Sequence, residues 1–379
     1  MAWFRCALAI EVVLFHTGQG WLAGPIAVAA FYVLSGYIIT RVIVENYSRE
    51  RRGTLRFYVN RLLRLLPAFL VVSALTMFTA LAAMHFWGMS AAQLPGHFAV
   101  QQYDGNLLTT FLRGVVPHVT FGLEPVPRLT STFGWIPPYW SVSIELGFYL
   151  LAPLLVACAL RWGYWVLPAL FALSAGGYAL SLVAIDGDPF LFTPGIYRNF
   201  LNSLPFFLWG ATLYAASRRL TYRFPVSLAT AGAVLFLVLI ATPSDDLQFI
   251  SILRPGVASN AVWHVLTLLA LVPVVLVAPL PARFLRLDRY LGDLSYGIYI
   301  NHFWVIAALQ LHPARVAQLR HEPFDLAATH FGLSQPVFQL VVVAISVVSA
   351  MLIFRLVETP VQSLRRRLGS RKPTDETNH

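Results

Sequence analysis

Three ionisable side chains lie in the first apolar segment of the chain, FRCALAIEVVLFHTG at residues 4–18. Arg5 and His16 are eleven residues apart, which on an α-helix is three turns plus about 20°, so both would lie on one face, separated by about 16 Å along the axis. Glu11 would lie on a different face. Because an ionisable group inside a membrane is costly and is a candidate functional site, the segment predicts either a catalytic histidine or a hydrogen-bonded contact between helices.

Glu145 lies within a later apolar segment, YWSVSIELGFYLLAP at 139–153. Ser141 precedes Glu145 by one helical turn and Tyr149 follows it by one turn, so all three would share a face. The carboxylate would lie about 9 Å inside the external end of the segment. This spacing indicates either a catalytic acid beside a substrate-binding serine and tyrosine, or a glutamate that pairs with a cation where helices pack.

A similar pattern occurs in LGDLSYGIYINHFWV at 291–305, where Ser295, Tyr299 and His302 follow spacings of four and three residues on one face. His302 would lie at the membrane depth deduced for His16. We therefore predict a catalytic group of His16, Glu145 and His302, with Ser295 and Tyr299 among the substrate-binding residues. The alternative for His302 is a hydrogen-bonded histidine of the core.

Two arginines one turn apart begin the segment RFYVNRLLRLLPAF at 56–69. Arg61 and Arg64 would share a helix face at the cytoplasmic entry of this segment. Paired guanidinium groups hold phosphate oxygens in a fork geometry, so the pair predicts a polyanion site, and anchoring to phospholipid headgroups is the alternative. Pro67 predicts a break in the helix just beyond them.

The composition indicates an integral membrane protein. The chain has 379 residues, of which 58% are hydrophobic and 12% charged, whereas soluble domains have about 25% charged residues. The net charge of +10 does not indicate nucleic-acid binding, because the basic residues cluster in short connectors such as RERRGTLR at 49–56, as the positive-inside rule expects. Cys6 and Cys158 have no CxxC-type neighbour, so they indicate no redox role, and we expect no metal.

Apolar stretches long enough to cross a bilayer recur along the chain and predict an all-α polytopic membrane protein of about ten transmembrane helices. The predicted segments are 4–20, 22–44, 58–84, 139–160, 164–184, 197–216, 224–241, 259–279, 291–311 and 336–357. We expect a transmembrane domain over residues 1–365 and a polar cytoplasmic tail over 366–379.

The basic connectors set the expected orientation. The loops 45–57, 217–223 and 282–289 are basic and, like the basic tail, are predicted to be cytoplasmic, so both termini would be cytoplasmic. An eleventh span within 85–138, around 107–116, would break this parity, so we interpret that region as a long external or re-entrant segment. A signal peptide at the N-terminus is disfavoured because Glu11 and His16 do not suit its apolar core.

Taken in order, these blocks resemble the acyltransferase 3 family of membrane O-acyltransferases. The resemblance covers about residues 3–365 and depends on the ordered set, since FYVLSG alone would be weak. The blocks are Arg5-x10-His16, FYVLSGYIIT at 31–40, Arg61-x-x-Arg64, YWSVSIELGFYL around Glu145, LGDLSYGIYINHFWV around His302 and VETP at 357–360.

The resemblance implies a ten-helix enzyme of the inner (plasma) membrane. It would take an acyl group, usually acetyl, from cytoplasmic acyl-coenzyme A (acetyl-CoA) and deliver it to a hydroxyl, often of a sugar in a surface polysaccharide or glycolipid. By the same resemblance His16 is the catalytic histidine and Glu145 the family's acid, while the motif arginines Arg5, Arg61 and Arg64 would bind the donor. A histidine suits such chemistry, because acyl transfer to an alcohol needs a base near the hydroxyl.

The sequence departs from the family pattern in two ways, and it leaves two other functions open. Glu11 stands where family members usually have a small apolar residue. We also expect no appended periplasmic SGNH domain of the kind that some members carry, so the chain would complete the chemistry alone. The first alternative is a transporter or flippase of a lipid-linked or acyl substrate, although the sequence shows no inverted-repeat pair of broken helices. The second is a non-catalytic membrane scaffold or sensor, which would leave His16, Glu145 and His302 without a shared purpose.

Overall fold

The computed structural model describes residues 2–18, 23–50, 52–88, 106–119, 138–185, 198–241, 257–278, 280–310 and 334–363. Within these ranges the chain forms helices and connectors, and its only β-contact is an isolated bridge between Phe224 and Val277. The prediction of an all-α fold is therefore confirmed for the described residues. The predicted tail, 366–379, lies outside them.

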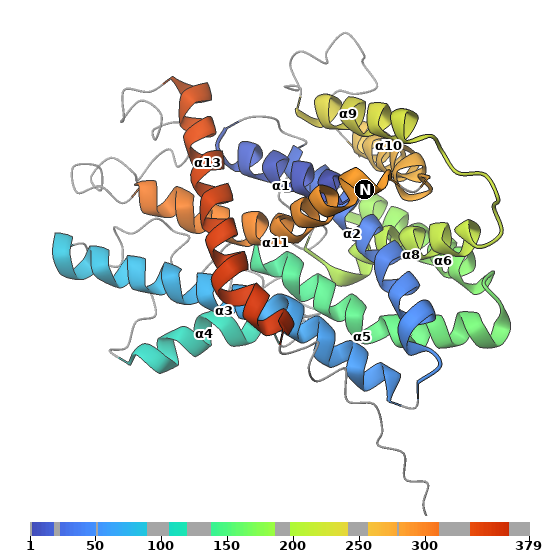
Figure 1. The fold of residues 1–379 in the computed structure, drawn as a ribbon, viewed down its shortest axis with the longest axis horizontal. Helices are drawn as coiled ribbons and strands as arrows, with labels where there is room; N and C mark the ends of the chain where they lie inside the picture. Colours follow the sequence, from blue (N-terminus) through green and yellow to red (C-terminus); the bar gives the residue numbers. More distant parts are fainter. Residues whose placement is uncertain are drawn as a thin grey trace, which may run out of the picture.

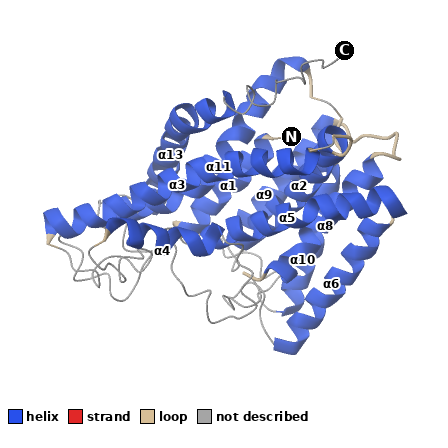
Figure 2. Cartoon of the chain, turned by 90° about the horizontal axis from the view of Figure 1, so that it is seen from below, coloured by secondary structure: helices blue, strands red, loops and turns tan. Residues whose placement is uncertain are grey.

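Figures 1 and 2 show how the helices pack around one another. In chain order they are α1 (Trp3–His16), α2 (Ala23–Val42), the π-helix η1 (Ile43–Tyr47), α3 (Gly53–Trp87), α4 (Leu107–Val119), α5 (Tyr139–Trp162), α6 (Val166–Ile185), α8 (Phe200–Ser217), α9 (Val226–Ala241), α10 (Val257–Val275), α11 (Ala282–Gln310), α13 (Gln335–Ile353) and the π-helix η6 (Phe354–Glu358).

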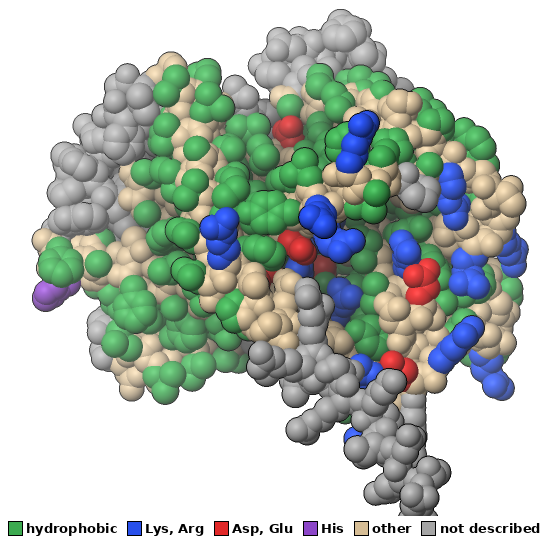
Figure 3. All heavy atoms as spheres, viewed as in Figure 1, with side chains coloured by type: hydrophobic (Ala, Val, Ile, Leu, Met, Phe, Trp, Pro, Cys, Tyr) green, Lys and Arg blue, Asp and Glu red, His purple; other side chains and the backbone are tan. Residues whose placement is uncertain are grey.

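A helix lies over every one of the ten predicted segments. Among the residues that the structure describes, four stretches are long and apolar enough to cross a membrane, namely Gly24–Tyr47, Gly53–Phe86, Trp140–Trp162 and Gln335–Ser363. On the face in Figure 3, hydrophobic side chains cover much of the surface, and most Lys and Arg side chains lie in its centre and right half. These features are those of a membrane protein, while the number of crossings and the side of each terminus stay predictions.

Two helices differ from their predicted form. Pro67 lies inside the continuous α3, so the predicted break is wrong. Proline is tolerated in such helices because neighbouring groups can satisfy the backbone carbonyl that it frees. Helix α11 begins at Ala282 rather than at 291, because the connector ARFLRLDRY is rich in arginine and leucine, which are good helix formers.

The region predicted to be external or re-entrant contains the short helix α4. Its N-terminus is capped by Asn106, whose side-chain oxygen accepts the backbone N–H groups of Leu108 at 3.0 Å and Thr109 at 3.2 Å. The helix has 13 residues, fewer than the roughly 20 that a crossing needs, and it packs against α3 and α5. Residues 89–105 and 120–137 of this region lie outside the described residues.

Helices α2 and α8 cross at very short distance because two glycines meet there. A Cβ atom at Gly36 of α2 would lie 2.0 Å from the carbonyl oxygen of Phe207, and one at Gly210 of α8 would lie 2.0 Å from that of Val33. Small residues allow membrane helices to approach in this way. The crossing fixes α2, which carries Ser35 into the site described below.

Helix α1 packs along α11 (Figure 1) and is tied at both ends. At its start, the backbone N–H of Trp3 donates to Asp288 Oδ1 of α11 at 2.8 Å. At its end, the amides of Gln335 and Gln339 of α13 donate to the carbonyl oxygen of Thr17. These contacts satisfy terminal backbone groups that a helix leaves unpaired, and they fix α1 along its axis.

Candidate functional site

Helices α1, α2, α3, α5 and α11 enclose two adjoining cavities. The linings of both include Arg5, Ser35, Glu145 and Tyr296. We name them by their other polar residues. The hydroxyl cavity is also lined by Ser141, Ser295 and Tyr299. The arginine cavity is also lined by Arg61, Arg64 and Tyr149.

The arginine cavity brings together guanidinium groups from two helices. Arg5 comes from α1, and Arg61 and Arg64 from α3. The Arg61 guanidinium lies 5.6 Å from the centre of the Phe57 ring and 5.9 Å from that of Tyr149. The Nε atoms of Arg5 and Arg61 are buried and have no hydrogen-bond partner among the described residues. Buried guanidinium donors without partners suit an anionic ligand, so the structure unites the three predicted arginines in an arrangement able to bind one.

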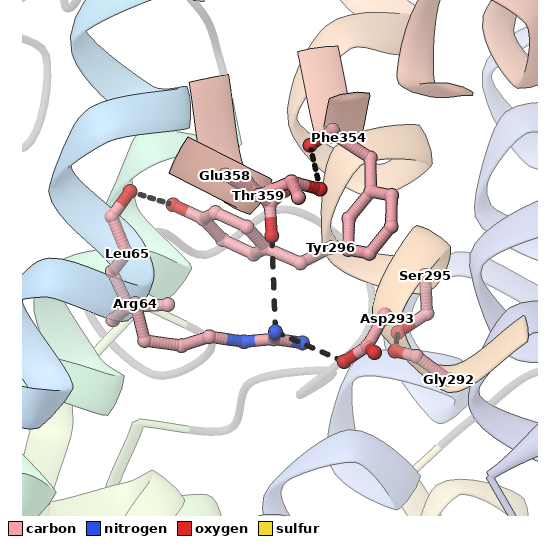
Figure 4. Close-up of polar contacts among 9 residues, drawn as sticks. All are labelled: Arg64, Leu65, Gly292, Asp293, Ser295, Tyr296, Phe354, Glu358 and Thr359. Carbon is pink, nitrogen blue, oxygen red and sulfur yellow. Dashed lines mark hydrogen bonds and ion pairs between the residues drawn. The ribbon is translucent and has the colours of Figure 1, made fainter. Parts of the chain in front are cut away.

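Arg64 differs from its neighbours because the structure gives it acidic partners (Figure 4). Its Nη1 lies 3.0 Å from Asp293 Oδ1 of α11 and 3.7 Å from Glu358 Oε2 of η6. Neither acid was predicted as a site residue. Both nevertheless stand in blocks that carry the family resemblance, LGDLSYG and VETP, and an acid in an apolar segment is itself a signal.

Glu145 lies between the two cavities and is held by two hydroxyl groups. Its Oε1 accepts from the Tyr149 hydroxyl at 2.5 Å and from the Ser35 hydroxyl at 3.2 Å. The predicted shared face of Glu145 and Tyr149 is therefore confirmed. Ser35 was missed as a site residue, although it belongs to the FYVLSG block.

The two histidines of α1 and α11 meet, as their predicted depth required. The His16 and His302 rings stack with centroids 5.3 Å apart and an angle of 25° between their planes. Phe303 packs against both, at 4.4 Å from the His16 ring and 4.7 Å from the His302 ring. Neither histidine is in the lining of the two cavities described above.

The hydrogen bonding of His302 determines which of its nitrogens carries a proton. Its Nδ1 lies 2.6 Å from the backbone carbonyl oxygen of Tyr299. A carbonyl only accepts, so Nδ1 is the donor, and in the neutral ring Nε2 holds the lone pair. This Nε2 is buried without a hydrogen-bond partner in the described part of the chain. A basic nitrogen is thus available on the ring stacked against His16.

Tyr299 connects the hydroxyl cavity to the histidine pair. Its side chain lines the cavity and hydrogen-bonds Ser141 at 2.6 Å, while its carbonyl holds His302. Since the Ser141 hydroxyl donates to the Pro138 carbonyl at 2.7 Å, the Tyr299 hydroxyl is the donor to Ser141. Ser295 donates to the Gly292 carbonyl at 2.7 Å, so its oxygen can still accept a bond from a ligand.

Glu11 lies outside the lining of both cavities. Its Oε2 is buried without a hydrogen-bond partner among the described residues. It also joins no metal-binding cluster, since the described residues contain no group of three or more His, Cys, Asp or Glu that could hold a metal ion. Nothing in the described structure explains this carboxylate.

Two relatives have informative names. The O-acetyltransferase OatA of Staphylococcus aureus is 26% identical over 324 residues, which are 80% of this chain and 49% of that protein. The peptidoglycan O-acetyltransferase OatA of Listeria monocytogenes is 25% identical over an alignment of 382 positions, which covers 94% of this chain and 54% of that protein. The chain thus spans about half the length of the curated relatives it matches. No solved structure matches it.

The family comparison covers nearly the whole chain. The model of the acyltransferase 3 family, described as an acyltransferase domain, matches residues 1–355. This range contains every site residue described above except Glu358, which lies three positions beyond it. The order of sequence blocks, the helical fold and the family match agree, and the chain belongs to the acyltransferase 3 family.

Proposed function

We propose that this chain is a membrane O-acetyltransferase that moves an acetyl group from acyl-CoA to a hydroxyl of a surface polysaccharide or glycoconjugate. The names of the relatives support acetyl transfer, and the Listeria relative is named for peptidoglycan. The observation that carries the proposal is that the arginine cavity and the hydroxyl cavity share four lining residues, and that Tyr299 of the hydroxyl cavity holds His302, which stacks on His16.

The donor would bind by its phosphate groups in the arginine cavity. Guanidinium forks match phosphate oxygens, and Arg5 and Arg61 each have a buried donor without a partner in the described residues. We place this end on the cytoplasmic side, because the basic connector at 49–56 leads directly into α3 and because acyl-CoA is a cytoplasmic metabolite.

The pantetheine arm would run from the arginines to the histidines. Arg5 and His16 belong to one helix, so they are about 16 Å apart along its axis. An extended thioester arm passing Glu145 and Tyr299 would cover this distance. The phosphates would then stay among the arginines while the thioester carbonyl approaches the histidine pair.

The histidine pair would supply the proton transfers. In the proposed step the acceptor hydroxyl oxygen bonds to the thioester carbonyl carbon as the carbon–sulfur bond breaks. His16 takes the hydroxyl proton and passes it to the departing sulfur, which leaves as the coenzyme A thiol. His302, whose Nδ1–H is held by a carbonyl, stacks on that ring and would keep His16 oriented for both transfers.

The proposal can be tested with purified protein in nanodiscs. Release of the coenzyme A thiol from acetyl-CoA is measured, and O-acetylation of sugar acceptors is measured by mass spectrometry. We expect turnover by the wild type, while His16→Ala and His302→Ala each lower kcat by at least about 100-fold with an unchanged thermal midpoint. Full activity of His16→Ala would refute the catalytic assignment, and a transporter of lipid-linked substrate would release no thiol. Comparing the envelope glycans of a deletion strain with its parent would identify the acceptor.

A further inference from the structure

Of the three arginines in the arginine cavity, Arg64 alone has ion pairs among the described residues. Figure 4 shows its guanidinium between Asp293 and Glu358, which come from two other elements, α11 and η6. The Tyr296 hydroxyl donates to the Leu65 carbonyl at 3.1 Å, which fastens α11 to α3 immediately beside this contact. The site of Arg64 is therefore built from three separate parts of the chain.

Glu358 has an unusual environment for a carboxylate. Its side chain is 4% exposed, and both carboxylate oxygens lack a hydrogen bond within the described residues. Burying a charge without hydrogen bonds is unfavourable, so packing alone does not account for an acid here. Glu358 ends the π-helix η6, and π-helical turns occur frequently at functional sites.

The two acids approach the same atom of Arg64. Asp293 and Glu358 both lie against Nη1, whereas a guanidinium has five N–H donors spread over three nitrogens. Because the acids engage Nη1, the N–H groups on the other two nitrogens stay available to a ligand. The Arg64 side chain lines the arginine cavity together with Arg5 and Arg61. The acids thus hold the guanidinium from the side of α11 and η6.

We propose that Glu358 and Asp293 are positioning residues that aim Arg64 at the anionic group of the acyl donor. This inference rests on the proposed function, since it assigns the donor's phosphate groups to the cavity. An arginine held in its binding orientation loses less conformational freedom when the ligand arrives. Asp293 accepts a hydrogen bond from Arg64 at 3.0 Å, and the buried Glu358 supplies a second charge that keeps the guanidinium in place.

The test compares Glu358→Gln with the wild type in nanodiscs, using coenzyme A alone as the binding probe and acetyl-CoA for turnover. We expect Kd for coenzyme A and KM for acetyl-CoA to rise about tenfold, with kcat within about twofold of the wild type. Glu358→Asp, which keeps the charge, should recover part of the affinity. The matched control is Thr359→Val, because the Thr359 hydroxyl donates to the Phe354 carbonyl at 2.9 Å within the same segment and not to Arg64.

A double-mutant cycle separates positioning from a general structural role. In an Arg64→Gln background, Glu358→Gln should have no further effect on Kd, because the group on which it acts is gone. An equal loss in both backgrounds, or an unchanged Kd in Glu358→Gln, overturns the inference and leaves the proposed function intact. If the wild type neither binds coenzyme A nor releases thiol, both the inference and the proposed function are wrong. If Glu358→Gln fails to fold, Asp293→Asn is measured in the same cycle with the same expected outcome.

Discussion

Arg61 and Arg64 lie one turn apart on α3 and line the same cavity, yet their surroundings differ. Arg61 lies against the aromatic rings of Phe57 and Tyr149, and its Nε has no hydrogen-bond partner among the described residues. Arg64 is held by two acids. Two arginines that look equivalent in the sequence therefore have different electrostatic environments, and Arg61 is the better candidate for direct contact with a phosphate.

At the residue scale, Arg61→Gln should raise KM for acetyl-CoA about tenfold or more, since it removes a charge-assisted hydrogen bond to the donor. Arg56→Gln is the matched control. Arg56 precedes Arg61 in the same helix, but it pairs with Glu50 at 2.6 Å on the exposed surface and lines neither cavity. KM for acetyl-CoA is measured for the two variants. An equal rise of KM in both would favour the alternative in which these arginines anchor the protein to lipid headgroups.

Sequence spacing predicted the contacts within one helix and missed most contacts between helices. The hydrogen bond from Tyr149 to Glu145 follows from four-residue spacing. The meeting of His16 with His302 followed from comparing membrane depths. In contrast, Glu358 is 294 positions from Arg64, and no periodicity within a segment specifies which helices will be neighbours.

At the element scale, the crossing of α2 and α8 controls the position of Ser35 against Glu145. Gly36→Ala would place a Cβ 2.0 Å from the Phe207 carbonyl oxygen, so the helices must separate, and we expect a destabilisation of about 3 kcal/mol together with lower activity. Thermal unfolding in detergent measures the loss of stability.

The control for that substitution is Gly177→Ala on α6, where a new Cβ meets no atom within 4 Å. Alanine also has a higher helix propensity than glycine, so this variant should unfold at the wild-type temperature or above. If Gly36→Ala behaved in the same way, the close approach of α2 and α8 would not be needed for stability.

Helix ends were harder to predict than helix existence. Hydrophobic length located each of the ten segments, but it did not reveal that α3 continues through Pro67 or that α11 starts at Ala282. Helix α4 coincides with the candidate span at 107–116, which was interpreted as part of an external or re-entrant segment, and its 13 residues are too few for a crossing. Local propensity and capping, rather than apolar length, determine these features.

At the scale of the whole molecule, the predicted orientation places the connector after α8 in the cytoplasm and α4 outside. In a Cys6→Ala, Cys158→Ala background, Arg219→Cys should react with a membrane-impermeant maleimide only in inverted vesicles, and Leu108→Cys only in intact cells. Both positions are exposed in the structure. Labelling of both from the same side would contradict the three crossings predicted between α4 and the connector after α8.

The tethering of α1 also determines how substitutions within that helix act. Asp288 holds its first turn and two glutamines of α13 hold its last. A residue inserted between Arg5 and His16 would turn the histidine by about 100° and shift it by about 1.5 Å, and the tethers leave α1 little room to slide in compensation. The helix is thus a spacer of set length, so conservative substitutions at positions other than Arg5 and His16 should be tolerated better than insertions or deletions.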